Sequence, residues 1–134
     1  MADTSHILIV DDDPDIRKVL FFLLKDNYFV EEAADGAAAV EYIAAHPETD
    51  LVVLDVMMPG MSGYEACGKI RALSNAPILF LTAKSAEADM ISAYGSGGDD
   101  FLSKPFSQGE FLFSAAPVQG VPRQARRGAD DRRP

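Results

Sequence analysis

The sequence of 134 residues contains a single cysteine, Cys67, which excludes an internal disulfide. We expect this side chain to pack inside a helix, with a reactive thiol as the alternative. No apolar run is long enough to cross a bilayer, and the N-terminus lacks the apolar core of a secretory signal peptide. We therefore expect a cytoplasmic protein that does not contact a membrane. Internal repeats are also absent from the sequence.

Basic residues are few, since 12 Lys and Arg stand against 21 Asp and Glu and give a net charge of -9. Because acidic surfaces repel nucleic-acid phosphates, we expect no nucleic-acid binding by this chain itself. Hydrophobic residues make up 48% of the sequence, which predicts a folded domain. We expect residues 1–116 to form that domain. The Pro-, Gly- and Arg-rich residues 117–134 are expected to be a poorly ordered tail.

Strand and helix patterns alternate along the domain. Five short apolar runs are typical of strands, and the second is weak enough to suit a sheet edge. They cover residues 6–10, 28–33, 51–55, 77–82 and 99–103. Five further segments are predicted to be helices. They cover residues 14–26, 37–45, 62–73, 85–94 and 108–116. The alternation predicts an α/β fold with one doubly wound, five-stranded parallel sheet and helices on both faces.

Local signals define several helix ends. Asp13 before a proline and Ser62 after a turn are expected to be N-caps. The last helix should be short or irregular, because Pro and Gly follow it closely, and Phe111 and Leu112 should be its packing residues.

The stretch that organises the chain is the apolar run 51–54, which ends in Asp55. A continuous apolar run this short predicts a strand that is covered on both faces. Pro59 and Gly60 then force a turn. Because ligands of open parallel sheets bind at the carboxyl ends of strands, we expect Asp55 to face a crevice.

Other polar residues end other strands in the same way. Asp11 and Asp12 follow the first strand, Thr82 ends the fourth, and Lys104 follows the fifth. Clustered carboxylates repel one another unless a cation lies among them, and all-oxygen ligands suit Mg²⁺. The pattern predicts a site for Mg²⁺ or Mn²⁺, with phosphate as a further ligand. Singly, each residue has an ordinary explanation as a helix cap, a strand end or a solvent-exposed lysine, but their joint occurrence at strand ends favours a functional site.

Four motifs in this order resemble the receiver domain of two-component response regulators. They are Ile-Val-Asp-Asp-Asp at 9–13, Asp-Val-Met-Met-Pro-Gly at 55–60, Leu-Thr-Ala at 81–83, and Gly-Asp-Asp-Phe-Leu-Ser-Lys-Pro-Phe at 98–106. The resemblance runs from about His6 to Phe113 and is greatest for receivers joined to a winged-helix DNA-binding domain of the OmpR/PhoB type. It implies a CheY-like fold with strand order 2-1-3-4-5.

The resemblance also implies roles for the acidic residues. Asp55 would accept a phosphoryl group from a phosphohistidine of a sensor histidine kinase. Asp12, Asp55 and the backbone carbonyl of Met57 would bind the metal directly, and Asp11 would hold a metal-bound water.

Three further residues would act on the phosphoryl group or respond to it. Lys104 would pair with a phosphoryl oxygen, next to a cis peptide bond before Pro105. Thr82 would bond to a phosphoryl oxygen, and Phe101 would then turn into the space that Thr82 leaves. The switch would remodel the face made by residues 85–94, 99–103 and 108–116 and so control an output, which is transcription in a full-length parent.

Two rival classes differ from this switch. A hydrolase of the haloacid-dehalogenase type needs a second Asp two positions after its nucleophile, where this chain has Met57. A degenerate receiver that only binds proteins typically lacks the acids or the lysine, and all of them are present here. We therefore expect no enzyme beyond self-phosphorylation from small phosphodonors and autodephosphorylation.

The segment 108–116 departs from the family. It has Glu110 but lacks the basic residues through which winged-helix regulators pair, which disfavours a receiver–receiver dimer through this face. We expect a receiver that has lost its output domain, for which a frameshift near residue 116 is one explanation. The alternative is a stand-alone single-domain regulator that acts by protein contact.

Overall fold

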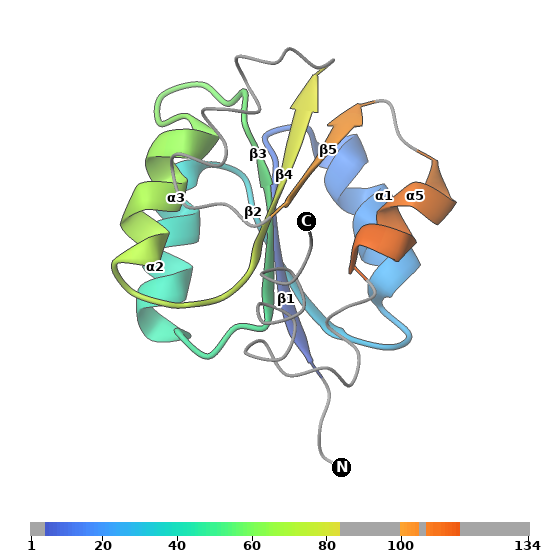
Figure 1. The fold of residues 1–134 in the computed structure, drawn as a ribbon, viewed down its shortest axis with the longest axis horizontal. Coiled ribbons are helices and arrows are strands. Elements are labelled where there is room, and N and C mark those ends of the chain that lie inside the picture. The colour runs from blue at the N-terminus through green and yellow to red at the C-terminus, as the bar shows by residue number, and fades with distance from the viewer. Residues whose placement is uncertain (1–4, 84–99, 105–106, 116–134) are drawn as a thin grey trace, which may run out of the picture.

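The computed structural model describes residues 5–83, 100–104 and 107–115. Its strands form one parallel sheet in the order β2-β1-β3-β4-β5, as Figure 1 shows. The strands are β1 His6–Val10, β2 Phe29–Ala33, β3 Leu51–Asp55, β4 Ile78–Ala83 and β5 Asp100–Lys104. The predicted strand order and the edge position of the second strand are therefore confirmed.

Helices cover both faces of this sheet, which confirms the doubly wound architecture (Figure 1). The described helices are α1 Pro14–Leu24, α2 Gly36–Ala45, α3 Gly63–Arg71 and α5 Gln108–Ala115. Helices α1 and α5 lie on one face, and α2 and α3 lie on the other. The helix expected at 85–94 and the tail at 117–134 lie outside the described residues.

The two predicted N-caps are confirmed. The Asp13 carboxylate accepts a hydrogen bond of 2.9 Å from the Asp15 amide, and Pro14 begins α1. The Ser62 hydroxyl accepts one of 3.2 Å from the Glu65 amide at the start of α3. Each cap satisfies an amide that has no partner within its helix.

Helices α1 and α3 each end two residues before the predicted position. At the end of α1 the amides of Asn27 and Tyr28 both donate to the Leu24 carbonyl, at 3.1 and 3.0 Å. These bonds close the last turn and direct the chain into β2. The boundary is therefore set by backbone bonds that apolar spacing does not reveal.

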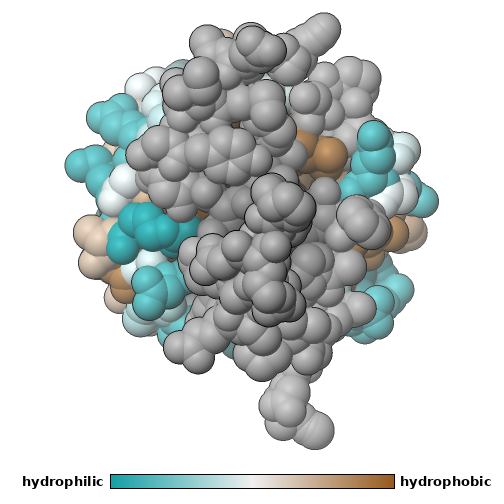
Figure 2. Space-filling model, viewed as in Figure 1, coloured by the Kyte–Doolittle hydropathy of each residue, from teal (hydrophilic) through white to brown (hydrophobic). Residues whose placement is uncertain are grey.

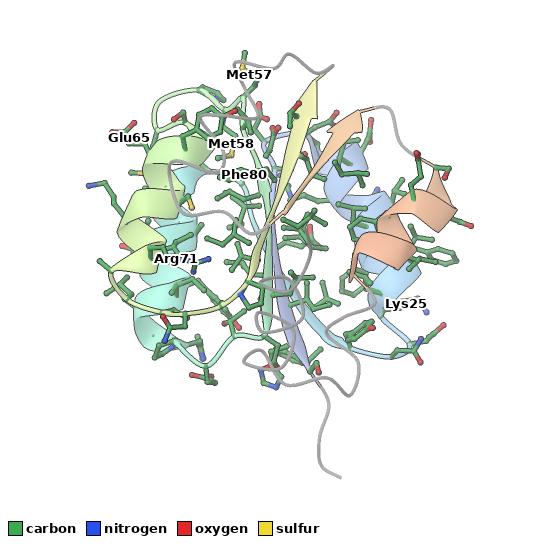
Figure 3. All side chains as sticks on the ribbon, in the orientation of Figure 1. Lys25, Met57, Met58, Glu65, Arg71 and Phe80 are labelled. Carbon is green, nitrogen blue, oxygen red and sulfur yellow. The ribbon has the colours of Figure 1, made fainter. Side chains whose placement is uncertain are left out.

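Side chains of successive strand residues point to opposite faces and fill two cores. Leu8 and Val10 of β1 pack toward α2 and α3, together with Phe80 of β4 (Figure 3). Ile7 and Ile9 pack on the other side, with residues of α1 and α5. Cys67 is fully buried in the first core, which confirms its expected packing role.

Among the described side chains of helix α5, Phe111 anchors the helix on the sheet. Phe111 is fully buried, whereas 41% of Leu112 is exposed. The prediction that both would pack was therefore wrong for Leu112, because consecutive helix residues point about 100° apart and α5 turns Phe111 toward the sheet. The helix has eight residues, which confirms that it is short.

The described outer surface is mostly hydrophilic over α2 and α3 on one flank and over α1 and α5 on the other (Figure 2). Every described helix falls short of the length and hydropathy that a membrane span requires.

Candidate functional site

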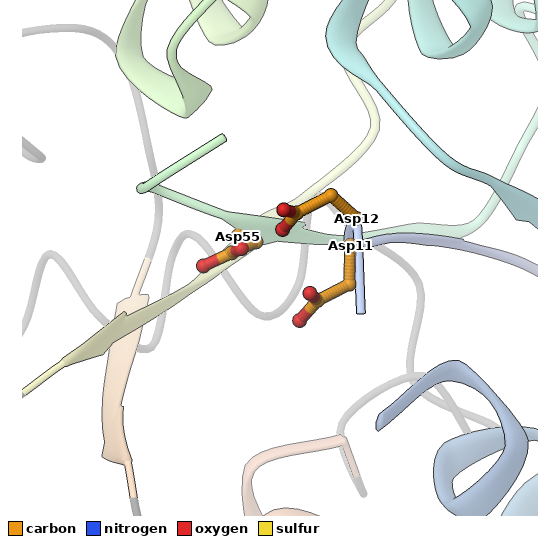
Figure 4. A group of neighbouring side chains, drawn as sticks. All are labelled: Asp11, Asp12 and Asp55. Atoms are coloured by element: carbon orange, nitrogen blue, oxygen red, sulfur yellow. The ribbon is translucent and has the colours of Figure 1, made fainter. Parts of the chain in front are cut away.

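Three carboxylates meet where the carboxyl ends of the strands lie, which we call the carboxyl edge of the sheet. Asp11 and Asp12 follow β1, and Asp55 is the last residue of the neighbouring strand β3, where Val10 is the register partner of Leu54. One oxygen of each carboxylate lies within 4.8 Å of the others, and Figure 4 shows the three side chains gathered at the two strand ends. The predicted convergence of these acids is therefore present.

The donor set of this cluster fits a hard divalent cation. Asp11 and Asp55 are buried, at 0% and 3% exposure, while Asp12 is exposed. Mg²⁺ prefers oxygen ligands and keeps several of its waters, which requires a site with one open side. Two carboxylates set into the sheet edge and a third on the solvent side meet that requirement, and Mn²⁺ accepts the same ligands.

Hydrogen bonds fix the backbone around Asp11. Its amide donates to the Ala33 carbonyl of β2 at 3.2 Å, and its carboxylate accepts from the Asp13 amide at 3.0 Å. Its carbonyl accepts from Nη1 of Arg17 at 2.7 Å. The first acid of the cluster is thus held at amide, carbonyl and side chain.

The connection after Asp55 brings the start of α3 against the strand end. The Met57 amide donates to Oδ1 of Asp55 over 3.4 Å, and 70% of the Met57 side chain is exposed at this edge (Figure 3). Gly60 has a φ of 79°, a left-handed conformation that favours glycine, so the expected turn is present. A Cβ on Gly63 would lie 2.2 Å from the Asp55 carbonyl oxygen, which only a glycine permits.

Thr82 carries a buried hydroxyl beside this edge. Leu81 is the register partner of Asp55, so Thr82 lies one residue further along β4. The residue is 2% exposed, and within the described part of the chain its Oγ1 is a buried side-chain oxygen without a hydrogen-bond partner. A buried hydroxyl without a partner costs about 1–3 kcal/mol, so the position favours a ligand that supplies an acceptor.

Strand β5 brings the backbone of the remaining predicted residues to the sheet. Phe101 is the register partner of Phe80, and Lys104, the last residue of the strand, is the partner of Ala83. Lys104 therefore ends its strand at the same edge as the acids. The side chains of Phe101 and Lys104, and the peptide bond to Pro105, lie outside the described part of the structure.

Sequence reasoning missed Arg17, Glu32 and Gly63. Arg17 shares a helix face with Leu20 and Leu24, and a cation on that buried apolar stripe was the available signal. Glu32 and Gly63 carried no local signal, because their roles depend on contacts with distant parts of the chain.

Residues 7–115 match the family described as the response regulator receiver domain. The uncharacterized transcriptional regulatory protein YrkP of Bacillus subtilis is 48% identical over 106 residues, which cover 78% of this chain and 45% of that protein. The sensory transduction protein RegX3 of Mycobacterium tuberculosis is 38% identical over 129 residues, which cover 95% of this chain and 53% of that protein. This chain therefore spans about half the length of these relatives.

Solved structures agree with the family match. The chemotaxis protein CheY4 of Vibrio cholerae superposes with a TM-score of 0.77 at 29% identity, over 87% of this chain and 99% of that one. A putative response regulator from Chloroflexus aurantiacus gives 0.79 at 32% identity, over 87% and 98%. DrrB, an OmpR/PhoB homolog from Thermotoga maritima, gives 0.77 at 28% identity, over 86% and 52%. The fold is thus CheY-like.

Proposed function

This chain belongs to the family of response regulator receiver domains, and on that premise we propose that Asp55 is its phosphoacceptor. Receiver domains are signalling switches that bind Mg²⁺ and interact with sensor histidine kinases, and they are not a classical enzyme family. The single observation that carries the proposal is the cluster of Asp11, Asp12 and Asp55 at the carboxyl edge of the sheet.

The proposed reaction is phosphoryl transfer to a carboxylate. An oxygen of Asp55 attacks the phosphorus of a kinase phosphohistidine, a P–O bond forms as the P–N bond breaks, and the product is an aspartyl phosphate. The burial of Asp55 at a strand end fixes the direction of its carboxylate and limits the access of water. Small phosphodonors would react in the same way, and hydrolysis would reset the switch.

The neighbouring residues have supporting roles. Asp12, Asp55 and the Met57 carbonyl would hold Mg²⁺ or Mn²⁺, with Asp11 holding one of its waters. When bound, the cation neutralises charge on the phosphoryl oxygens. Lys104 would contact a phosphoryl oxygen from the end of β5, which runs to the same edge.

The switch begins at Thr82. Its buried hydroxyl lacks a partner within the described part of the chain, so a new phosphoryl oxygen would give it an acceptor. Movement of Thr82 would allow Phe101 to turn inward and would remodel the face that includes β5, α5 and residues 85–94. Because such switching shifts a population between two states, phosphorylation would favour a form that already exists at low level.

For the output, transcription control in a longer parent protein is the first candidate. It is supported by relatives that are named transcriptional regulatory proteins and are about twice as long as the matching region. A stand-alone regulator that acts by protein contact is the second candidate, supported by CheY4, which this chain covers almost completely.

The test is labelling of the full chain by acetyl phosphate in the presence of Mg²⁺, followed by intact mass. The wild type should gain one acid-stable, base-labile phosphoryl group, and Asp55→Asn should gain none. Asp50→Asn is the matched control, because Asp50 lies just before the other end of β3 and accepts a bond of 2.8 Å from the His6 amide, which an asparagine oxygen can keep. That variant should be labelled like the wild type.

Two results would contradict the proposal. Full labelling of Asp55→Asn would show that another residue is the acceptor. Rapid release of phosphate without any accumulated adduct would favour a hydrolase that uses an Asp nucleophile.

A further inference from the structure

Arg17 connects the acidic loop to the edge strand. Its Nη1 donates to the Asp11 carbonyl at 2.7 Å, and its Nε donates to Oε1 of Glu32 at 3.1 Å. The Arg17 side chain is only 19% exposed, and that of Glu32 is 37% exposed. The planar guanidinium therefore bridges a backbone carbonyl of the cluster and a carboxylate of β2.

The carbonyl that Arg17 holds belongs to the peptide group between Asp11 and Asp12. Because a peptide group is planar, fixing this oxygen also fixes the amide and the Cα of Asp12. The next peptide group is fixed by the Asp13 amide, which donates to the Asp11 carboxylate at 3.0 Å, so the two groups together set the direction of the Asp12 Cα–Cβ bond. No hydrogen bond to the Asp12 carboxylate is formed within the described part of the chain, and this side chain is exposed. The backbone on both sides of Asp12, of which Arg17 holds the first peptide group, therefore directs the Asp12 side chain toward the cluster.

Charge favours the same role. A bare guanidinium beside a cation site would repel the incoming metal, but the Glu32 carboxylate neutralises it. Arg17 thus links the acidic loop to β2 through one hydrogen bond to each, and the pair adds no net positive charge beside the site.

We propose that Arg17, anchored by Glu32, is a positioning residue that aims Asp12 into the cluster and thereby sets the affinity of the site for Mg²⁺. This inference rests on the proposed function, because it takes the acidic cluster as the Mg²⁺ site. Arg17 itself touches neither the cation nor the phosphoryl group.

The experiment measures Mg²⁺ binding to the full chain by isothermal titration calorimetry and measures urea unfolding in EDTA. Arg17→Ala should weaken Mg²⁺ binding roughly tenfold, the usual effect of losing a residue that orients a metal ligand. Arg17→Lys keeps the charge but lacks the planar fork, so it should weaken binding roughly threefold or more. Glu32→Gln keeps an acceptor oxygen for Nε but removes the charge that neutralises the guanidinium, so it should weaken Mg²⁺ binding by less than Arg17→Ala does.

Arg71→Ala is the matched control. Arg71 is also half-buried and also donates to backbone carbonyls, those of Ser74 at 3.3 Å and Ala76 at 2.6 Å. These lie before β4, at the edge opposite the acids, and Figure 3 shows Arg71 far from Met57. The variant should lose stability in EDTA and keep its Mg²⁺ affinity, because distant sites act independently.

The direction of the change in Mg²⁺ affinity distinguishes a positioning role of Arg17 from simple charge repulsion. Unchanged or tighter Mg²⁺ binding by Arg17→Ala would overturn the inference and leave the proposed function intact, since a merely cationic Arg17 would oppose metal binding. If Arg17→Ala does not fold, Arg17→Lys decides in the same way, and wild-type affinity in that variant overturns the inference. Absence of Mg²⁺ binding by the wild type would overturn the proposed function and the inference together.

Discussion

The buried hydroxyl of Thr82, which has no hydrogen-bond partner among the described residues, should lower the free energy of unfolding of the protein. Thr82→Val removes it with little change of shape, so the variant should unfold with a free energy about 1 kcal/mol higher than the wild type. The same variant should lose the response to beryllofluoride, because no hydroxyl remains to bond to the phosphoryl mimic. Urea unfolding and amide chemical shifts measure the two effects on the same samples.

Thr49→Val is the control for this prediction. Thr49 is equally buried, but its Oγ1 donates to the His46 carbonyl at 2.7 Å. Loss of that bond should destabilise the protein by about 1 kcal/mol and leave the beryllofluoride response unchanged. A Thr82→Val variant that is destabilised and still responds would contradict the role given to this hydroxyl.

Tyr42 gives the protein a sensitivity to alkaline pH. Burial raises the pKa of its phenol, and the negative charges of Glu31 and Glu48 raise that pKa further. Because the folded state holds this proton more tightly, its contribution to stability is present below the ordinary tyrosine pKa and is lost as the pH rises through the folded value. Between about pH 9 and pH 11, the free energy of unfolding should therefore fall less steeply for Tyr42→Phe than for the wild type. Parallel curves would show that this phenol has no such effect.

At the scale of single elements, the start of helix α3 packs against the end of strand β3. A Cβ on Gly63 would lie 2.2 Å from the Asp55 carbonyl oxygen and 2.8 Å from the Val56 Cα, both backbone atoms that cannot move aside. Gly63→Ala should cost about 1–3 kcal/mol and should also slow labelling of Asp55, because relief of the clash displaces the strand end.

Gly68 supplies the comparison within the same helix. It is exposed, and a Cβ there would meet no atom within 4 Å. Gly68→Ala should therefore stabilise the protein by about 0.5–1 kcal/mol through helix propensity, with unchanged labelling. If Gly63→Ala behaved like Gly68→Ala, the close packing of α3 on Asp55 would be unimportant.

The sequence predicts which residues form and cap each helix better than it predicts which residues of different elements touch. The caps at Asp13 and Ser62 could be predicted from the sequence, because a cap depends only on residues within one turn of the helix. The close approach of Gly63 to the backbone of β3 could not be predicted, because it depends on how α3 packs on β3. Similarly, Leu112 follows an apolar pattern, and only the direction of α5 leaves it partly exposed.

At the scale of the whole molecule, the family resemblance implied the strand order of the sheet, and the positions of Asp11, Asp12 and Asp55 at strand ends predicted that they meet. Parallel strands joined by helices bring their carboxyl ends to one edge, so polar residues at strand ends must approach one another. The ion pair between Arg17 and Glu32 was not predictable, because it links α1 to β2 through side chains that become neighbours only in the folded chain.

Metal binding should be linked to global stability through the acidic cluster. A ligand that binds only the folded state stabilises it by about 2.7 kcal/mol at 100 times its dissociation constant, so Mg²⁺ should raise the free energy of unfolding of the wild type. Asp12→Ala removes one of three mutually repelling carboxylates. In EDTA this variant should be more stable than the wild type, and in saturating Mg²⁺ it should be less stable.

Asp13→Ala is the control. It shows whether the opposite effects of Asp12→Ala in EDTA and in Mg²⁺ are specific to Asp12 or follow from the loss of any carboxylate. Asp13 is the neighbouring residue, but its side chain caps α1 and lies outside the cluster. Its loss should cost about 1 kcal/mol equally in EDTA and in Mg²⁺, so the stabilisation by Mg²⁺ should match that of the wild type. Urea titrations of the three proteins in both buffers measure all six values. If Asp12→Ala gained as much from Mg²⁺ as Asp13→Ala does, Asp12 would not be a ligand, because a carboxylate that binds the cation cannot be removed without losing that gain.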